Sequence, residues 1–279
     1  MTLVATPIGN MEDITLRALR VLNEADLIAA EDTRRTRKLL SRYDIHGRMV
    51  SCHGQNEQKR VPELIKALRS GMHVALVSDA GSPGIRDPGT RLVQGAVEAG
   101  IPVTAIPGPS AVVLSLSLSG LPSDRFTFYG FLPRNRTERR TLLEEAARVS
   151  HTLIFFESPH RLIKSMESML EVFGDRAAAL CRELTKRFEQ VERASLSQLI
   201  QPAKEQGPRG EFCIVVAGKA PKTTQPQETE EALHSALKEL EQMGEESLKD
   251  AARKLADKYG ISKRTVYEAA LRKRKGADA

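Results

Sequence analysis

The stretch HVALVSDAGSPGIRDPG, residues 73–89, places a short apolar strand directly before a loop of unusual composition. Its first half is apolar at consecutive positions, which is typical of a strand covered on both faces in a mainly parallel sheet. Its second half holds the conformationally special residues Gly81, Pro83, Gly84, Pro88 and Gly89. Such a loop brings its backbone close to a ligand. Asp79 and Asp87 add acceptors for hydroxyl protons, so we expect a ligand loop rather than a plain surface turn.

Short apolar runs alternate with segments of helical spacing on both sides of this stretch. Strands are predicted at 2–6, 26–30, 48–52 and 102–106, in addition to 73–79. The segments between them, 13–22, 33–42, 57–70 and 89–99, carry helical periodicity. This alternation predicts a βαβ series, and with it an α/β domain over residues 1–119 that is built on a parallel sheet.

A second α/β domain is predicted for residues 120–219, because Gly, Pro, Ser and Asp cluster at 119–125 and end the preceding pattern. Its strands are expected at 125–131, 152–158, 177–184, 188–194 and 211–218, with helices at 134–149 and from His160. The third and fourth of these strands lie too close together for a crossover helix to fit between them. We therefore expect a hairpin, which makes the second sheet mixed.

Residues 220–246 are expected to form a polar, proline-containing linker and a helix, and residues 247–279 a small basic helix-turn-helix-like module. Gly260 is predicted to make the turn and Ser262 to cap the second helix, while Val266 faces back onto the first. Such modules often enter a DNA major groove. The corresponding groove of A-form RNA is too narrow, so contacts with RNA phosphates are expected instead.

Positive charge is concentrated at the end of the chain. Residues 248–275 hold ten Lys or Arg against three Asp or Glu, a net charge of +7, so the rest of the chain contributes −1 to the total of +6. A concentrated basic segment is typical of a protein that binds nucleic acid. On charge alone, an exposed basic helix without a partner is an equally good interpretation.

Composition excludes several other classes of protein. With 41% hydrophobic and 28% charged residues, the 279-residue chain matches a soluble globular enzyme and not a disordered protein. Aromatic residues make up 4%, without any Trp, which disfavours a surface built mainly on base stacking. The opening residues MTLVATPIGN lack a basic leader and a long apolar run, so neither a signal peptide nor a membrane span is predicted.

The three cysteines, Cys52, Cys181 and Cys213, are odd in number and widely spaced. Zinc and redox sites need closely paired ligands, so no metal site is predicted. We expect buried thiols in the reducing cytoplasm.

Two further turns follow predicted strands, at the edge where open α/β sheets place their ligands. ATPIGN, residues 5–10, has one Gly and no Lys, so it is neither a GxxxxGK phosphate loop nor a GxGxxG dinucleotide turn. AIPGPSA, residues 105–111, fixes the chain before a helix that Ser110 is expected to cap. Its small residues let backbone amides face a ligand.

The ordered set LVATPIGN, AEDTRRTRKLL, VSDAGSPGIRDPG, IPGPSA, FFESPHRL and GEFCIVVAG resembles the branch of the tetrapyrrole-methylase superfamily that methylates ribose 2′-hydroxyls in 16S ribosomal RNA. The resemblance covers essentially the whole chain, and the motifs together are highly specific. It implies two α/β domains with S-adenosylmethionine in the cleft between them, and a homodimer. It also implies, as substrate, a cytidine in the decoding region of the 16S rRNA of the small ribosomal subunit.

The resemblance also implies roles for individual residues. Pro7 matches the first cofactor loop, and Gly108, Ser110 and Ala111 match the PGxSA cofactor turn. Phe156 and Ala217 match strands that close over the adenine in relatives. Ser82, Pro83 and Ile85 match the loop beside the methionine part of the cofactor. Many relatives have Asp where this chain has Ser82, so this position offers a hydroxyl in place of a carboxylate.

Methyl transfer from a sulfonium mainly requires alignment of the reacting atoms, and a base need only take the hydroxyl proton as the new bond forms. The candidate bases are Glu31, Asp32, Asp79, Asp87 and Glu157. The sequence does not choose among them. For any one of them alone, a salt bridge or a helix cap is the more ordinary role.

Three groups of basic residues are candidates for RNA binding, because guanidinium and ammonium groups bind phosphates. They comprise Arg34, Arg35 and Lys38, then Arg134 and Arg136, and finally Lys263, Arg264, Arg272 and Lys273. Arg34, Arg35 and Lys38 follow Glu31 and Asp32 at a predicted helix start. Acidic side chains at the start of a helix and basic side chains further along it also interact favourably with the helix dipole, so this order has a purely structural explanation as well. The second group is equally compatible with an exposed helix.

Two rival functions fit part of the sequence. A methylase of a tetrapyrrole or another small substrate would explain the cofactor loops but leave the basic end without a purpose. A DNA-binding regulator with a ligand-sensing α/β body would explain the basic end but not EDTRRTRK or FFESPHRL.

Overall fold

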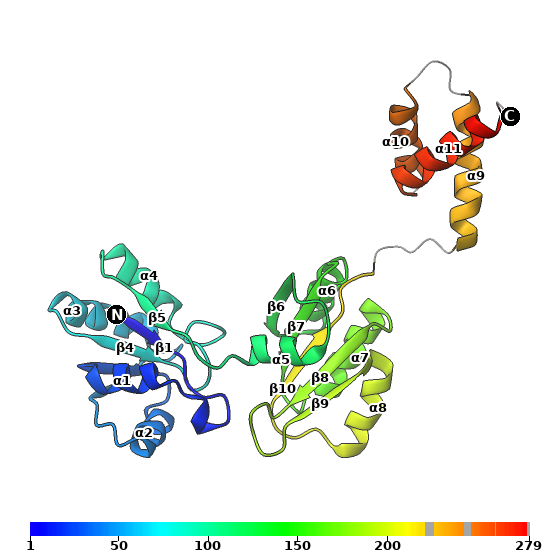
Figure 1. Ribbon diagram of the computed structural model, residues 1–279. Coiled ribbons are helices and arrows are strands. Elements are labelled where there is room, and N and C mark those ends of the chain that lie inside the picture. The colour runs from blue at the N-terminus through cyan, green and yellow to red at the C-terminus, as the bar shows by residue number, and fades with distance from the viewer. Residues whose placement is uncertain (221–225, 243–246, 260, 278–279) are drawn as a thin grey trace. The chain divides into compact units, whose positions relative to one another are not determined.

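The computed structural model describes residues 1–220, 226–242, 247–259 and 261–277. The chain forms two compact units, Met1–Lys219 and Ala220–Ala279 (Figure 1). The first unit contains two sheets, and the second is helical.

The first sheet is entirely parallel, as the alternating pattern predicts. Its strands run in the order β3-β2-β4-β1-β5 and comprise β1 (Thr2–Val4), β2 (Leu27–Ala30), β3 (Met49–Ser51), β4 (Val74–Val77) and β5 (Thr104–Ile106). Every residue of β2 and β4 is buried. The runs that are apolar at consecutive positions are therefore strands covered on both faces of the sheet.

Four helices cover this sheet, two on each face. They are α1 (Leu16–Glu24), α2 (Thr33–Arg42), α3 (Glu57–Arg69) and α4 (Thr90–Glu98). Ile28 and Ala30 of β2 pack with α1 and α2, whereas Leu27 and Ala29 pack with α3 and α4. The short 3-10 helix η1 (Met11–Asp13) lies between β1 and α1. This arrangement leaves the carboxyl ends of β1, β4 and β5 free to carry loops.

Helix α5 (Ala111–Ser119) packs on the second sheet, not on the first. Val112 and Leu116 share a cluster with Ile154, Ala179 and Val215 of that sheet (Figure 1). The predicted boundary at 119/120 therefore follows a helix whose packing belongs to the second half. This packing is not evident from the sequence, because AVVLSLSLS is apolar around its whole circumference.

The second sheet is mixed, as expected. Its strands run in the order β6-β7-β10-β8-β9 and comprise β6 (Phe126–Phe131), β7 (Thr152–Glu157), β8 (Ala177–Arg182), β9 (Gln190–Ser195) and β10 (Phe212–Val216). Only β6 and β7 pair in parallel, and β8 and β9 form the predicted hairpin. The α/β class with one parallel and one mixed sheet is confirmed.

The face of this sheet opposite α5 is covered by α6 (Arg136–Ala146), α7 (Leu162–Phe173) and α8 (Leu196–Gln206). No helix was predicted at α8. A capping box formed by Ser195 and Gln198 starts it, and Leu199 and Ile200 are buried against the sheet. Pro202 lies inside this helix and obscures the helical pattern.

The helical unit comprises α9 (Pro226–Gln242), α10 (Leu248–Tyr259) and α11 (Lys263–Ala277). The backbone amide of Thr265 donates to the Ser262 hydroxyl at 3.0 Å, so Ser262 caps α11 as predicted. Gly260 lies outside the described residues. Helix α9, which was expected to belong with the linker, packs with α10 and α11, because Ala236 shares a buried core with Leu255 and Val266.

Among the described residues, no helix is long and apolar enough to cross a membrane. The same part of the chain holds no group of three or more His, Cys, Asp or Glu arranged for a metal ion. Cys52, Cys181 and Cys213 are free and buried.

Candidate active site

Three loops meet at the carboxyl ends of β1, β4 and β5. Thr6 exchanges two backbone hydrogen bonds with Gly81, both 2.9 Å, which joins the loop after β1 to the loop after β4. A Cβ atom at Gly108 would lie 2.8 Å from the Cβ of Ala5, so the loop after β5 touches the first loop as well. The three turns singled out in the sequence are therefore parts of one structure.

The loop after β4 depends on backbone conformations that favour glycine. Gly81, Gly84 and Gly89 have φ values of 77°, 83° and 135°. The buried carboxylate of Glu57 anchors the end of this loop, because it accepts from the backbone amide of Gly89 at 2.9 Å. Arg86 also has a positive φ, 68°, although it is not glycine.

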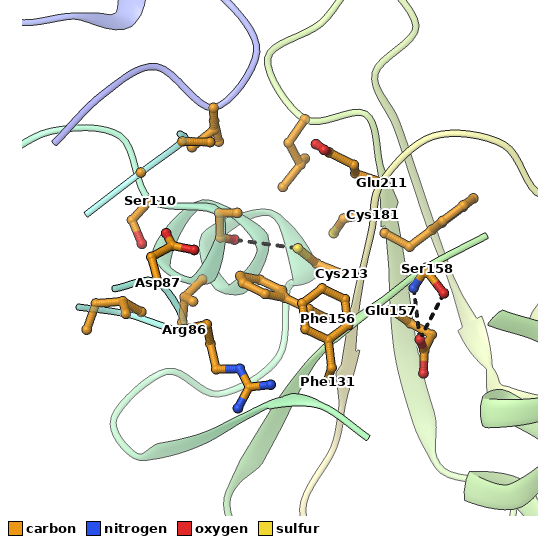
Figure 2. A pocket seen from close by; sticks show the side chains of 18 of the residues that line it. Arg86, Asp87, Ser110, Phe131, Phe156, Glu157, Ser158, Cys181, Glu211 and Cys213 are labelled. Carbon is orange, nitrogen blue, oxygen red and sulfur yellow. Dashed lines mark hydrogen bonds between the residues drawn. The ribbon is translucent and has the colours of Figure 1, made fainter. Parts of the chain in front are cut away.

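These loops form one side of a cavity of about 340 Å³ in the first unit, and the second sheet forms the other side (Figure 2). The loop side is lined by Ile8, Ala80, Gly81, Ser82, Ile85, Arg86, Asp87 and the start of α5 at Ser110, Ala111 and Val112. The sheet side is lined by Phe131, Phe156, Glu157, Ser158, Pro159, Cys181, Leu184, Gly210, Glu211, Phe212 and Cys213. The volume is in the range of small-molecule sites.

The two sides offer different chemistry. The sheet side is largely apolar, with Phe156, Leu184 and the buried thiols of Cys181 and Cys213. Burial raises the pKa of these thiols to about 11 and 12, so both stay protonated and neutral. The loop side offers the carboxylate of Asp87 and the start of α5, whose first amides have no partner within the helix.

Three of the predicted bases, Glu31, Asp79 and Asp87, lie close together in the segments that follow β2 and β4. The backbone amide of Asp79 donates to Glu31 at 3.2 Å, and the amide of Asp32 donates to Asp79 at 3.0 Å. Burial, then repulsion from Glu31, raises the pKa of Asp87 to about 6. Burial also raises the pKa of Glu31. Of this group, Asp87 alone lines the cavity.

Glu157 and Asp32 have other partners. The Glu157 carboxylate accepts from the hydroxyl of Ser165 at 2.6 Å and from the amide of Ser158 at 2.8 Å, and it lies 3.4 Å from the Arg161 guanidinium. It points away from Asp87 in Figure 2. Asp32 caps α2 and binds Arg34, which lowers the pKa of Asp32. Both side chains are thus engaged in structural contacts.

The structure brings some of the predicted cofactor residues to the cavity and leaves others outside its lining. Ser82, Ile85, Ser110, Ala111 and Phe156 line it, and Ser110 caps α5 as expected. Pro7, Pro83 and Gly108 belong to the same loops but do not line it. Ala217 follows the end of β10 remote from Phe212, because Phe212 pairs with Glu157 and Val216 with Leu153. It therefore lies away from the cavity.

Several lining residues were not singled out in the sequence: Arg86, Phe131, Ser158, Leu184 and Glu211, together with Cys181 and Cys213, for which only a buried role was expected. Leu184 and Glu211 had no signal of their own, since they become neighbours only through the pairing of β8 with β10. Ser158 lies in the quoted FFESPHRL and could have been included.

The predicted RNA-binding residues are exposed where their side chains are described. Arg34 pairs with Asp32 at 2.8 Å, Arg35 with Asp79 at 3.4 Å, and Arg264 with Glu268 at 2.7 Å. Lys38, Arg134, Arg136, Lys263 and Arg272 are exposed as well. The side chain of Lys273 lies outside the described residues. Through this pair, Arg35 lies beside Asp79, which is in turn next to Glu31.

Replacing Gly108 by Ala should weaken ligand binding at the cavity about tenfold, because the added Cβ would push the loop that carries Ser110 and Ala111 away from Ala5. Calorimetric titration with S-adenosylmethionine measures the change. A second substitution, Ala5→Gly, removes the colliding atom and should restore most of the affinity. Gly54→Ala is the matched control, because nothing lies within 4 Å of the new Cβ there. If Gly108→Ala bound S-adenosylmethionine as tightly as the wild type, the turn at residues 105–111 would not be part of the binding site.

Comparison with known proteins places most of the first unit in one family. Residues 1–200 match the family model of the Tetrapyrrole (Corrin/Porphyrin) Methylases. A crystal structure of uroporphyrin-III C-methyltransferase from Thermus thermophilus, complexed with S-adenyl homocysteine, has a TM-score of 0.54. The two sequences are 22% identical, and the match covers 77% of this chain and 96% of the methyltransferase chain. At this level of identity the likeness supports the fold alone.

Curated relatives extend the likeness to nearly the whole chain. A Halalkalibacterium halodurans protein named Ribosomal RNA small subunit methyltransferase I is 46% identical over 268 residues, 95% of this chain and 92% of its own. A Thermotoga maritima protein of the same name is 44% identical over 219 residues. That match covers 78% of this chain but 98% of the relative, so the relative has no counterpart for about a fifth of the chain.

Proposed function

The chain belongs to the tetrapyrrole (corrin/porphyrin) methylase family, and from this premise we propose that it methylates the ribose 2′-hydroxyl of a cytidine in the decoding region of 16S ribosomal RNA. It is an S-adenosylmethionine-dependent methyltransferase. The observation that carries the proposal is the 46% identity, over 95% of the chain, to a protein named as a small-subunit rRNA methyltransferase. The homodimer and the cytoplasmic location implied by the resemblance are part of the same proposal.

The residues of the cavity fit S-adenosylmethionine. Phe156, Leu184 and Cys213 offer an apolar wall for an adenine ring. The first amides of α5 suit a carboxylate, and the carboxylate of Glu211 complements positive charge. When bound, the cofactor supplies an electrophilic methyl group on a sulfonium.

Asp87 is the residue that we assign as the base. It lines the cavity, whereas Glu31 and Asp79 support it from outside the lining, and Glu157 has three other partners. A raised pKa makes a carboxylate a better proton acceptor while leaving it ionised at neutral pH. The remaining task of the cavity walls is to hold the acceptor oxygen in line with the methyl carbon and to exclude water.

The pH dependence of the reaction should follow this assignment. Asp87 must be ionised to accept a proton, so kcat/KM for the RNA should rise about tenfold per pH unit below its pKa of about 6 and level off above it. Initial rates of methyl transfer from pH 5 to pH 8 measure the profile. A rate independent of pH across this window would exclude a base with a pKa near 6.

Transfer of labelled methyl groups tests the proposal directly. Unmodified 30S subunits, free 16S rRNA, a tetrapyrrole and duplex DNA are offered as separate acceptors. We expect label on the small-subunit RNA, and after nuclease digestion on a cytidine 2′-oxygen. Label on the tetrapyrrole would favour the small-substrate function, and binding of duplex DNA without transfer would favour a regulator.

A further inference from the structure

Arg86 occupies a backbone conformation that its side chain disfavours. Its φ of 68° lies in the left-handed region, which is strained for a residue other than glycine. Glycine would avoid this strain, and three other positions of the same loop are glycines with positive φ. A strained residue retained in a ligand loop points to a role for its side chain.

The second sheet makes room for this side chain. The pairing of β6 with β7 shifts register between Phe128 and Gly130, a bulge in which Gly130 has a φ of 70°. A Cβ at Gly130 would lie 2.5 Å from Nε of Arg86, so any larger residue there would displace the Arg86 side chain from its present place. The guanidinium also lies 5.8 Å from the centroid of the Phe131 ring. Both side chains are labelled in Figure 2. The strained backbone of Arg86 and the bulge at Gly130 therefore place one side chain against Phe131 at the cavity.

Arg86 forms no ion pair within 4.0 Å in the described part of the chain; its charge acts on the neighbouring Asp87 only through space and slightly opposes the rise in the pKa of that carboxyl. Other arginines near the carboxylate group do pair, as Arg34 does with Asp32 and Arg35 with Asp79. A held guanidinium that donates to no carboxylate of the protein keeps its donors for an anionic ligand.

We propose that Arg86 binds the phosphodiester group next to the acceptor ribose and so positions the target nucleotide. This inference rests on the proposed function. In RNA the 2′-hydroxyl and the 3′-phosphate are attached to neighbouring ribose carbons, so a base for the first and a cation for the second must lie close together. Asp87 and Arg86 are consecutive residues lining one cavity. Arg86 is thus a substrate-positioning residue, distinct from the base.

Two substitutions separate charge from backbone strain. Asn tolerates positive φ and has no charge, so Arg86→Asn keeps the loop conformation while removing the cation. Arg86→Lys keeps the cation but loses the paired geometry of the guanidinium. Arg148→Met is the control, because Arg148 is exposed in the turn after α6 and does not line the cavity.

Binding of the full-length variants to unmodified 30S subunits is measured over a range of salt, alongside calorimetric affinity for S-adenosylmethionine. We expect Arg86→Asn to bind 30S subunits about tenfold more weakly, with the slope of log affinity against log salt reduced by roughly 0.7 to 0.9, because one phosphate group is no longer neutralised. Arg86→Lys should recover part of the affinity. Affinity for S-adenosylmethionine should stay within about twofold of wild type.

Unchanged 30S binding by Arg86→Asn would overturn the inference, and so would a loss confined to S-adenosylmethionine affinity, which would make Arg86 a cofactor ligand. The binding readout does not require methyl transfer. If the wild type binds 30S subunits without methylating them, the proposed function fails while the role of Arg86 is still measured. Wild-type protein that does not bind 30S subunits overturns both.

Discussion

Replacing Asp87 by Asn should lower kcat for methyl transfer to RNA by about 100- to 10,000-fold, the range that a positioned general base contributes. The substitution preserves size and removes the only carboxylate of the Glu31, Asp79 and Asp87 group that lines the cavity. Affinity for S-adenosylmethionine should change much less than kcat, because a base acts on the acceptor hydroxyl. Single-turnover rates with saturating cofactor and 30S subunits measure the effect.

Stability separates this loss of activity from simple unfolding. The pKa of Asp87 is raised in the fold to about 6, so its ionised form is disfavoured there relative to the unfolded chain. The native state therefore loses stability as pH rises from about 4 to above 6, and Asp87→Asn should melt no lower than wild type at pH 8. Asp124→Asn, on an exposed loop, is the matched control. If Asp87→Asn retained a kcat close to that of the wild type, Asp87 would not be the base for methyl transfer.

The first sheet could be predicted closely because its signals are local. Consecutive apolar residues in β2 and β4 identify doubly covered strands, and the Gly and Pro positions after β4 mark the ligand loop. The convergence of the three loops also follows from local order, since the carboxyl ends of parallel strands share one edge. Asp79 and Asp87 could both be proposed, but not ranked, because ranking depends on burial.

The second half of the cavity could not be predicted, because it depends on contacts between distant residues. Cys181 and Cys213 have the composition of core residues, and only the antiparallel pairing of β8 with β10 brings them together at the cavity. The packing of α5 is equally hidden, since its sequence has no polar face to exclude either sheet. Arg86 meets Gly130 only because β6 carries a bulge.

Removing the helical unit by truncation after Ala220 should reduce affinity for 30S subunits on the order of 10- to 100-fold while leaving affinity for S-adenosylmethionine unchanged. The cavity lies wholly within Met1–Lys219, so its lining is preserved. The Thermotoga maritima relative has the same rRNA methyltransferase name, and 219 residues of this chain match 98% of its length. That relative therefore has no counterpart for about a fifth of this chain. The first unit is therefore expected to fold and to retain catalysis, with weakened substrate binding.

Salt dependence identifies the origin of that weakening. Each RNA phosphate that the protein no longer neutralises should flatten the slope of log affinity against log salt by roughly 0.7 to 0.9. Lys263 and Arg272 are exposed on α11, so removing both charges should lower the slope by between about 1.4 and 1.8. The full-length Lys263→Ala, Arg272→Ala variant should reproduce this part of the change without truncation. A truncated enzyme that binds and methylates 30S subunits with the full-length slope would instead assign RNA docking to the arginines of the first unit.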